Sequence, residues 1–216
     1  MRNRAILWDM DGVLADSGGA HFLAWQGMFR ELGRDIDRQA FDDTFGMANS
    51  AILRHWLGDT LSDDEAHDLA RRKEALYRTY VDQVTLTPGV DAWLDHARSQ
   101  GYYQVVASSG EMANIVAVVN SLGLGNYFHG IVSGAFLPKS KPDPAIFLQA
   151  AAAVSADPAH CLVIEDGIVG IEAARRAGMR CLALTTTHPA ERLQGADHIA
   201  PTLADLPIST LDEMLA

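Results

Sequence analysis

The chain has 216 residues, of which 48% are hydrophobic, and a formal net charge of -11 at pH 7. This length suits one large domain or a domain with a sizeable insertion, and the apolar content is enough for a true core. No apolar run approaches the roughly 18 residues of a membrane span, and the start MRNRAILWD reaches an aspartate too early for a signal peptide. No cluster of Lys and Arg matches a phosphate backbone or a membrane face. We therefore expect a cytoplasmic monomer with no membrane or nucleic-acid partner.

The first predicted element is a short buried strand over residues 5–8, followed directly by Asp9 and Asp11, with Gly12 supplying the freedom for a turn. On an extended segment residues i and i+2 point to the same face, so the two carboxylates are expected within about 7 Å of each other. Two like charges at that distance need a cation or a proton between them. The pair therefore indicates a metal site or an acid/base pair, although a solvated turn with incidental acids explains this short motif equally well.

A helical block follows this strand. A helical pattern of apolar residues runs to Gly33, and Ser62 with Glu65 has the signature of a capping box at the start of a highly charged helix. The Pro-Gly break in LTPGV, residues 86–90, then ends the block. We expect a helical domain over residues 17–86, inserted into a domain formed by residues 1–16 and 87–216.

Short apolar strands alternate with helices in the rest of the chain. The strands are expected at residues 103–107, 130–133, 161–164 and 181–184. Helices between them are expected to end at Gly101, Gly123 and Gly178, and one is expected to start with Asp143 as its cap and Pro144 as its first residue. This alternation predicts an α/β fold with a parallel sheet, covered on both faces, that includes the first strand. Cys161 and Cys181 each open an apolar run and are expected to be buried, reduced thiols.

Polar side chains follow four of these strands, and ligands of open parallel sheets bind beyond the carboxyl ends of the strands. In chain order they are Asp9 and Asp11, Ser108 and Ser109, Lys141, and Glu165 and Asp166. Four acids with one lysine are too negative to stand without a divalent cation, and hard oxygen ligands select magnesium. Each feature alone has a simpler explanation, such as an exposed lysine or helix-start acids. Their joint position at four strand ends favours a functional site.

Such a site can accept a phosphoryl group. The cation and Lys141 would neutralise the phosphoryl oxygens, and Ser108 would donate a hydrogen bond. One aspartate is then placed to attack phosphorus, while the second suits proton transfer.

Four motifs carry a resemblance to a known family. They are DMDGVLAD from Asp9, VVASS with Ser108 and Ser109, KPDPAIF from Lys141, and IEDGIVGIEAA with Glu165 and Asp166. In this order and spacing the chain resembles the haloacid dehalogenase superfamily of phosphotransferases over essentially its whole length, nearest to the β-phosphoglucomutase-like branch. The resemblance implies a Rossmann-like core with a helical-bundle cap inserted after the first motif.

The same resemblance implies roles for individual residues. Asp9 is the nucleophile that forms an aspartyl-phosphate, and Asp11 is the general acid/base. Ser108 and Lys141 hold the phosphate, with Ser109 beside them. The implied magnesium ligands are Asp9, the Asp11 carbonyl, Glu165 and Asp166. Because dehalogenation needs neither a metal nor an acid for a leaving oxygen, Asp11 and the Glu165–Asp166 pair argue against that reaction.

The helical cap bears on the choice between a mutase and a phosphatase. His21, in HFLAW, resembles a cap histidine of β-phosphoglucomutase, although a core histidine is the simpler reading. Asn49, three residues after glycine in FGMANSAIL, stands where that enzyme carries an arginine for the distal phosphate. An amide supplies no charge for a phosphate. Arg54 or Lys73 could substitute; Lys73 resembles a substrate-facing lysine, and an exposed lysine on a charged helix is the alternative.

We therefore predict a magnesium-dependent phosphatase acting on a small phosphorylated metabolite such as a sugar phosphate, with a β-phosphoglucomutase-type phosphomutase as the alternative. A response-regulator receiver also combines acids, a lysine and a hydroxyl at strand ends. Its phosphorylated aspartate follows an acid pair in a domain of about 120 residues, whereas here the paired aspartates come first. An inactive phosphosugar-binding protein would have no need of Asp11.

Overall fold

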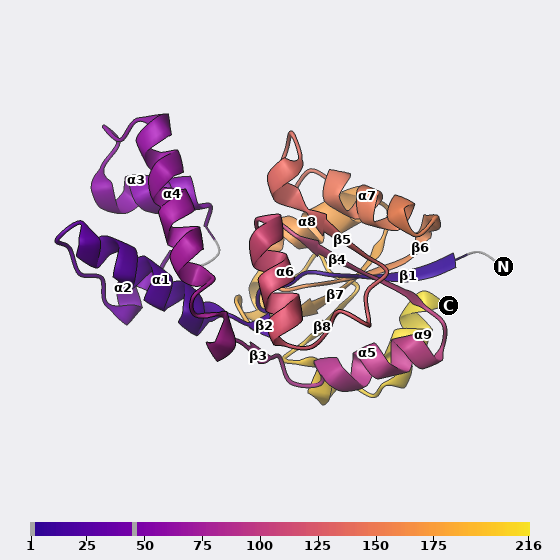
Figure 1. The fold of residues 1–216 in the computed structure, drawn as a ribbon. Coiled ribbons are helices and arrows are strands. Elements are labelled where there is room, and N and C mark those ends of the chain that lie inside the picture. The colour runs from indigo at the N-terminus through magenta and orange to yellow at the C-terminus, as the bar shows by residue number, and fades with distance from the viewer. Residues whose placement is uncertain (1–2, 45–46) are drawn as a thin grey trace. The chain divides into compact units, whose positions relative to one another are not determined.

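A six-stranded parallel sheet is the centre of one of the two units into which the chain divides (Figure 1). The computed structural model describes residues 3–44 and 47–216. The core unit comprises Met1–Asp16 and Thr85–Ala216, and the helical unit comprises Ser17–Val84. The predicted boundary after residue 86 differs from this division because β3 (Thr85–Leu86) pairs antiparallel with β2 (Ala15–Asp16). This pairing keeps both strands in the core unit.

The sheet has the strand order β5-β4-β1-β6-β7-β8, and every neighbouring pair is parallel. Its strands are β1 (Asn3–Trp8), β4 (Tyr103–Ser108), β5 (Gly130–Ser133), β6 (Ala156–Glu165), β7 (Arg180–Leu184) and β8 (His198–Ala200). The predicted α/β class with a Rossmann-like parallel sheet is confirmed. From β1 the chain builds outward through β4 to β5, then returns to β6 on the other side of β1. In such sheets the ligand crevice lies at this reversal, here between the carboxyl ends of β1 and β6.

Helices cover both faces of the sheet. In Figure 1, α7 and α8 lie on one face, and α5 and α9 lie on the other. The helices of the core unit are α5 (Val90–Ser99), α6 (Met112–Ser121), α7 (Ala145–Ala153), α8 (Ile168–Arg176) and α9 (Ser209–Leu215), with the 3-10 turns η2 (Gly134–Phe136), η3 (Ala190–Arg192) and η4 (Leu203–Asp205). Leu7, Val105 and Val163 from three central strands are fully buried in one cluster with Phe147 of α7 and Ile171 of α8. The central segments of β1, β4, β6 and β7 are continuous apolar runs because both faces of the sheet are covered.

Local sequence signals set most of the element boundaries. Gly101, Gly123 and Gly178 follow the ends of α5, α6 and α8 with φ of 72°, 69° and 72°, which is the left-handed conformation that favours glycine after a helix. The prediction that Asp143 caps α7 with Pro144 as the first helical residue is wrong by one residue, because the helix begins at Ala145 and Pro144 is its N-cap. Asp143 precedes the N-cap, and its Oδ1 accepts from Ala145 N at 3.0 Å.

Some elements differ from the sequence prediction. β8 was not predicted, and β6 begins at Ala156, well before residue 161. Both extra stretches lack the continuous apolar pattern that marks the central strands. Cys161 and Cys181 are buried free thiols, as expected.

The helical unit has its own hydrophobic core. Its elements are α1 (Gly18–Glu31), α2 (Arg38–Asp42), α3 (Asn49–Leu57), α4 (Asp63–Tyr77) and the 3-10 turn η1 (Val81–Gln83). Trp25 and Phe29 of α1, Phe41 of α2 and Leu53 of α3 are buried together. The capping box at Ser62 is confirmed as the start of α4. Among the described helices, none is both long and apolar enough to cross a bilayer.

Candidate active site

Three buried carboxylates meet at the carboxyl ends of β1 and β6. Asp9 follows β1, Glu165 ends β6 and Asp166 follows it, and one ligand oxygen from each lies within 4.8 Å of the others. The sheet positions them, because Asp9 N donates to Ile164 O at 3.0 Å and so extends the β1–β6 ladder up to the acids. The cluster therefore lies at the reversal of strand order, where ligands of this fold class bind.

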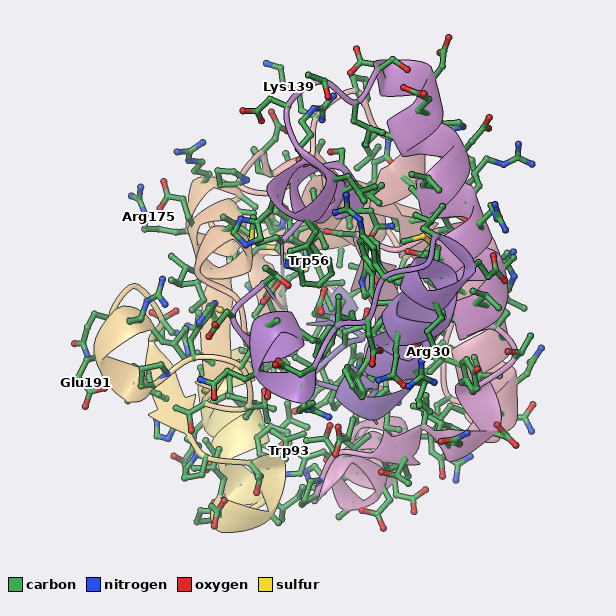
Figure 2. The ribbon with its side chains drawn as sticks, turned by 90° about the vertical axis from the view of Figure 1, so that its left-hand side faces the viewer. Arg30, Trp56, Trp93, Lys139, Arg175 and Glu191 are labelled. Atoms are coloured by element: carbon green, nitrogen blue, oxygen red, sulfur yellow. The ribbon has the colours of Figure 1, made fainter. Side chains whose placement is uncertain are left out.

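Lys141 is the cation of this cluster. Its Nζ lies 2.5 Å from Asp9 Oδ1 and 2.7 Å from Glu165 Oε1, and its side chain is 6% exposed. It also lies over the Phe147 ring at 5.0 Å. The alternative of an exposed lysine is therefore wrong for Lys141, whereas Lys139 of the same loop is exposed and projects from the surface (Figure 2).

The carboxylates are short of positive charge. Burial raises the pKa of Asp9 to about 7, with Glu165 and Asp11 adding to the rise and Lys141 opposing it. Burial also raises the pKa of Asp166, again with help from neighbouring acids. Burial alone would lower the pKa of Lys141, but Asp9 and Glu165 outweigh it and raise that pKa. Among the described residues, this cluster therefore contains three carboxylates and one ammonium group.

Glu165 is held from two sides. Its Oε2 accepts from Asp166 N at 2.8 Å and from Gly167 N at 2.7 Å, while Oε1 accepts from Lys141. The carboxylate thereby accepts from the two backbone N–H groups that directly precede α8. It also lies against Gly170 of α8, where a Cβ would collide with it. The Glu165 carboxylate can therefore occupy this position only because residue 170 has no side chain.

Asp11 does not share a strand face with Asp9 as the sequence argument assumed. β1 ends at Trp8, and the chain then turns, with Leu14 N and Ala15 N both donating to Met10 O at 2.9 Å. Gly12, with φ of 76°, allows this turn. The side chain of Asp11 is half-buried and is not among the three gathered carboxylates, although its charge contributes to the raised pKa of Asp9. The i, i+2 rule fails here because it holds only within a strand.

Ser108 and Ser109 follow β4, the strand beside β1. Ser108 ends β4 and is buried, and its Oγ accepts from Gly110 N at 3.1 Å. Because a hydroxyl also has one hydrogen to donate, Ser108 can still offer a hydrogen bond to a phosphoryl oxygen. Ser109 is exposed.

The sequence reasoning missed Thr186 and Thr187, which follow β7. Thr187 Oγ1 donates to Asp166 Oδ2, and Thr186 Oγ1 donates to Gly12 O at 2.7 Å. A signal was present, since β7 was predicted and three threonines follow its apolar run in CLALTTTHP. The same reasoning about strand ends, applied to this strand, identifies them.

The helical unit gathers the other predicted residues into a separate cluster. Lys73 Nζ lies 2.8 Å from His21 Nδ1 and 2.9 Å from Glu74 Oε1, and Asn49 Nδ2 donates to that oxygen at 2.6 Å. His21 stacks on Tyr77 with ring centroids 4.0 Å apart. Because an ammonium only donates, His21 Nδ1 accepts, and neutral His21 carries its hydrogen on Nε2.

Lys73 is 2% exposed, so the alternative of an exposed lysine is wrong here too. Burial would raise the pKa of Glu74, but Lys73 and Asn49 outweigh it and lower that pKa. Glu74 is therefore a carboxylate that balances the charge of Lys73. Arg54 is also paired, with Asp63. Gly46, from which the comparison at Asn49 was counted, lies outside the described residues.

The donor set fits a hard divalent cation. Asp9, Glu165 and Asp166 offer only oxygen ligands, and neighbouring acids add to burial in raising the pKa values of Asp9 and Asp166. Magnesium prefers such carboxylate ligands. When bound, Mg²⁺ would supply charge neutralisation and polarisation of a phosphoryl group.

The fold and this cluster define an α/β protein with a buried acid–lysine site at the carboxyl ends of its parallel strands, and the comparisons identify its family. Residues 3–178 match the model of the haloacid dehalogenase-like hydrolases, and the chain belongs to that family. It is 31% identical to β-phosphoglucomutase of Bacillus subtilis, covering 97% of this chain and 94% of that protein. It is 33% identical to the fructose-1-phosphate phosphatase YqaB of Escherichia coli, covering 82% of this chain and 94% of that one.

A solved structure supports the same family assignment. The β-phosphoglucomutase of Clostridium difficile matches with a TM-score of 0.84 and 26% identity, covering 99% of this chain and 97% of that one. The chain is accordingly an enzyme of the haloacid dehalogenase superfamily, of the phosphatase or phosphomutase type.

Proposed function

We propose that this enzyme is a magnesium-dependent phosphatase that hydrolyses a small phosphorylated metabolite through an aspartyl-phosphate on Asp9. The observation that carries the proposal is the buried cluster in which Lys141 contacts both Asp9 and Glu165 at the reversal of strand order. A phosphatase and a phosphomutase among the relatives support a phosphorylated sugar as the substrate class.

In the first half-reaction, a carboxylate oxygen of Asp9 attacks phosphorus, and the bond between phosphorus and the substrate oxygen breaks. Asp11 donates a proton to the leaving oxygen, so the product departs as an alcohol. Lys141 offsets charge on Asp9 and on the phosphoryl oxygens, and Ser108 donates a hydrogen bond to one of them.

In the second half-reaction, Asp11 accepts a proton from water as the water oxygen attacks the phosphorus of the acyl phosphate. The bond between phosphorus and Asp9 breaks, and inorganic phosphate leaves with Asp9 restored as a carboxylate. A mutase differs only in the acceptor, which is then a second sugar phosphate in place of water.

The helical unit favours water as the acceptor. A mutase must hold a bisphosphate by both ends, which calls for unbalanced positive charge at a second phosphate site. In this chain Lys73 is paired with Glu74, Arg54 is paired with Asp63, and Asn49 is neutral and bonded to Glu74. The cationic side chains considered for a second phosphate are thus balanced by acids.

A β-phosphoglucomutase-type activity is the second candidate. The similarity of nearly the whole chain to two β-phosphoglucomutases favours it.

One assay separates the two candidates. Purified protein with magnesium is incubated with β-glucose 1-phosphate and a trace of glucose 1,6-bisphosphate, and glucose 6-phosphate and free phosphate are measured in the same tubes. A parallel series uses fructose 1-phosphate. Free phosphate supports the proposal, and glucose 6-phosphate without free phosphate would replace it with the mutase.

Two variants test the assigned chemistry. We expect Lys141→Met to lose activity and Lys139→Met, its exposed neighbour in the same loop, to retain it. We expect Asp11→Asn to slow hydrolysis of an alkyl phosphate more than that of an activated aryl phosphate, because only the poor leaving group needs the proton. Equal losses on both substrates would count against Asp11 as the acid.

A further inference from the structure

The loop after β7 reaches the acid cluster through two threonine hydroxyls. Thr187 Oγ1 donates to Asp166 Oδ2. Thr186 Oγ1 lies 3.3 Å from the same Oδ2 and 2.7 Å from Gly12 O, to which it donates its one hydrogen. One carboxylate oxygen of Asp166 is thereby held by this loop.

The sheet explains why this loop meets Asp166. β7 pairs parallel with β6, with Ala183 opposite Glu165, so residues just beyond Leu184 lie beside the residue that follows Glu165. Gly12 lies against the same carboxylate, since a Cβ there would collide with Asp166 Oδ2 and lie 3.1 Å from Thr187 Oγ1. Two chain segments, the loop after β7 and the turn at Gly12, therefore confine the Asp166 carboxylate.

This confinement divides the two oxygens of Asp166 between two tasks. Oδ2 accepts from Thr187, and no hydrogen bond from the described residues engages Oδ1, so Oδ1 is available to a cation. A carboxylate that is fixed by a hydrogen bond pays less ordering entropy when it binds a metal, and such supporting contacts commonly change metal affinity by about 10-fold to 100-fold.

We propose that Thr187, assisted by Thr186, is a positioning residue that fixes Asp166 for magnesium. This inference rests on the proposed magnesium-dependent function. Thr187 donates to the metal ligand directly, whereas the shorter contact of Thr186 goes to the Gly12 carbonyl in the loop that carries Asp11. The two threonines thus have separable effects. Thr187 acts on metal affinity, whereas Thr186 acts mainly on the position of the loop that carries Asp11.

The test measures divalent-cation affinity directly. Binding of Mg²⁺ to the full-length protein is followed by titration calorimetry, and binding of Mn²⁺ by electron paramagnetic resonance. The variants are Thr187→Val, Thr187→Ser, which keeps the hydroxyl, and Thr185→Val. Thr185 is the matched control because its hydroxyl forms no hydrogen bond to any described residue, although its backbone N donates to Ala200 O at 2.9 Å.

We expect Thr187→Val to weaken Mg²⁺ binding about 10-fold, and Thr187→Ser and Thr185→Val to bind within about 2-fold of the wild type. Thr186→Val should weaken binding less than Thr187→Val. In activity assays, Thr187→Val should raise the Mg²⁺ concentration for half-maximal rate, with kcat at saturating Mg²⁺ close to that of the wild type. Urea midpoints of all variants establish that they are folded.

Three results would overturn the inference in distinguishable ways. Wild-type affinity in Thr187→Val removes the positioning role while leaving the proposed function intact. A fall in kcat with no change in Mg²⁺ requirement assigns Thr187 a purely structural part. Absence of saturable Mg²⁺ binding by the wild type refutes the metal-dependent function itself, and the inference falls with it.

Discussion

Replacement of Gly170 by alanine tests whether the Glu165 carboxylate lies where the structure places it. In a helix interior alanine is favoured over glycine by about 1 kcal/mol. Gly27, inside α1, is the matched control, because a Cβ there would meet Leu76 Cδ1 at 3.7 Å, an ordinary contact. We therefore expect Gly27→Ala to raise the free energy of unfolding by about 0.5–1 kcal/mol.

Gly170→Ala should have the opposite sign. The new Cβ would collide with the Glu165 carboxylate, which is held by Lys141 and by the N–H groups of Asp166 and Gly167. A hydrogen bond to a charged group contributes about 1.5–3 kcal/mol. Loss of one or two of these, offset by the helical gain, lowers the free energy of unfolding by about 0.5–5 kcal/mol.

The assay is urea unfolding, followed by tryptophan fluorescence in buffer with a chelator, for the wild type and both variants. An equal gain of stability in Gly170→Ala and Gly27→Ala would refute the reasoning, because it would mean that the Glu165 side chain does not occupy the space above Gly170.

Three further predictions concern other groups. Asp9→Asn should abolish phosphate release from every substrate, and substantial residual turnover in a clean preparation would contradict the role of Asp9 as nucleophile. Glu74→Gln leaves Lys73 buried without its counterion and should lower the free energy of unfolding at pH 7 by about 3 kcal/mol. The pKa of Glu74 is lower in the folded state than its usual 4.5. The stability that ionised Glu74 contributes is therefore complete above pH 4.5 and is lost as the pH falls through the pKa of the folded state. The urea midpoints of wild type and variant should accordingly converge as the pH is lowered below 4.5. Burial raises the pKa of Cys161 to about 12 and that of Cys181 as well, so iodoacetamide at pH 8 should label both thiols rapidly in urea and slowly in the native protein, as mass spectrometry can follow.

The sheet could be predicted because its signals are local. Continuous apolar runs mark the central strands, and Gly101, Gly123 and Gly178 mark helix ends by a conformation that glycine adopts most easily. β8 carries no such run, and the β2–β3 pair consists of two residues on each side, too short for any periodicity. These elements depend on their partners in space, which a pattern along the chain does not contain.

The two buried lysines, Lys141 and Lys73, also differ in how far the sequence predicts their partners. Lysine is almost never buried unless it is paired, so each needed an acid that the fold brings to it. For Lys141 the acids are Asp9 and Glu165, which lie at the carboxyl ends of the parallel neighbouring strands β1 and β6. Because the carboxyl ends of such strands share one edge of the sheet, topology alone indicates that these residues meet.

For Lys73 the acid is its neighbour Glu74, and consecutive residues on a helix do not face each other. Their side chains meet because Glu74 also reaches Asn49 of α3 while Lys73 reaches His21 of α1. That arrangement depends on how three helices are rotated about their axes, which helical periodicity defines only to within a broad face. The contacts of residues at strand ends can therefore be predicted from the sheet topology. The charge balance of the helical unit cannot, because it depends on the packed structure, and the choice between phosphatase and mutase depends on that balance.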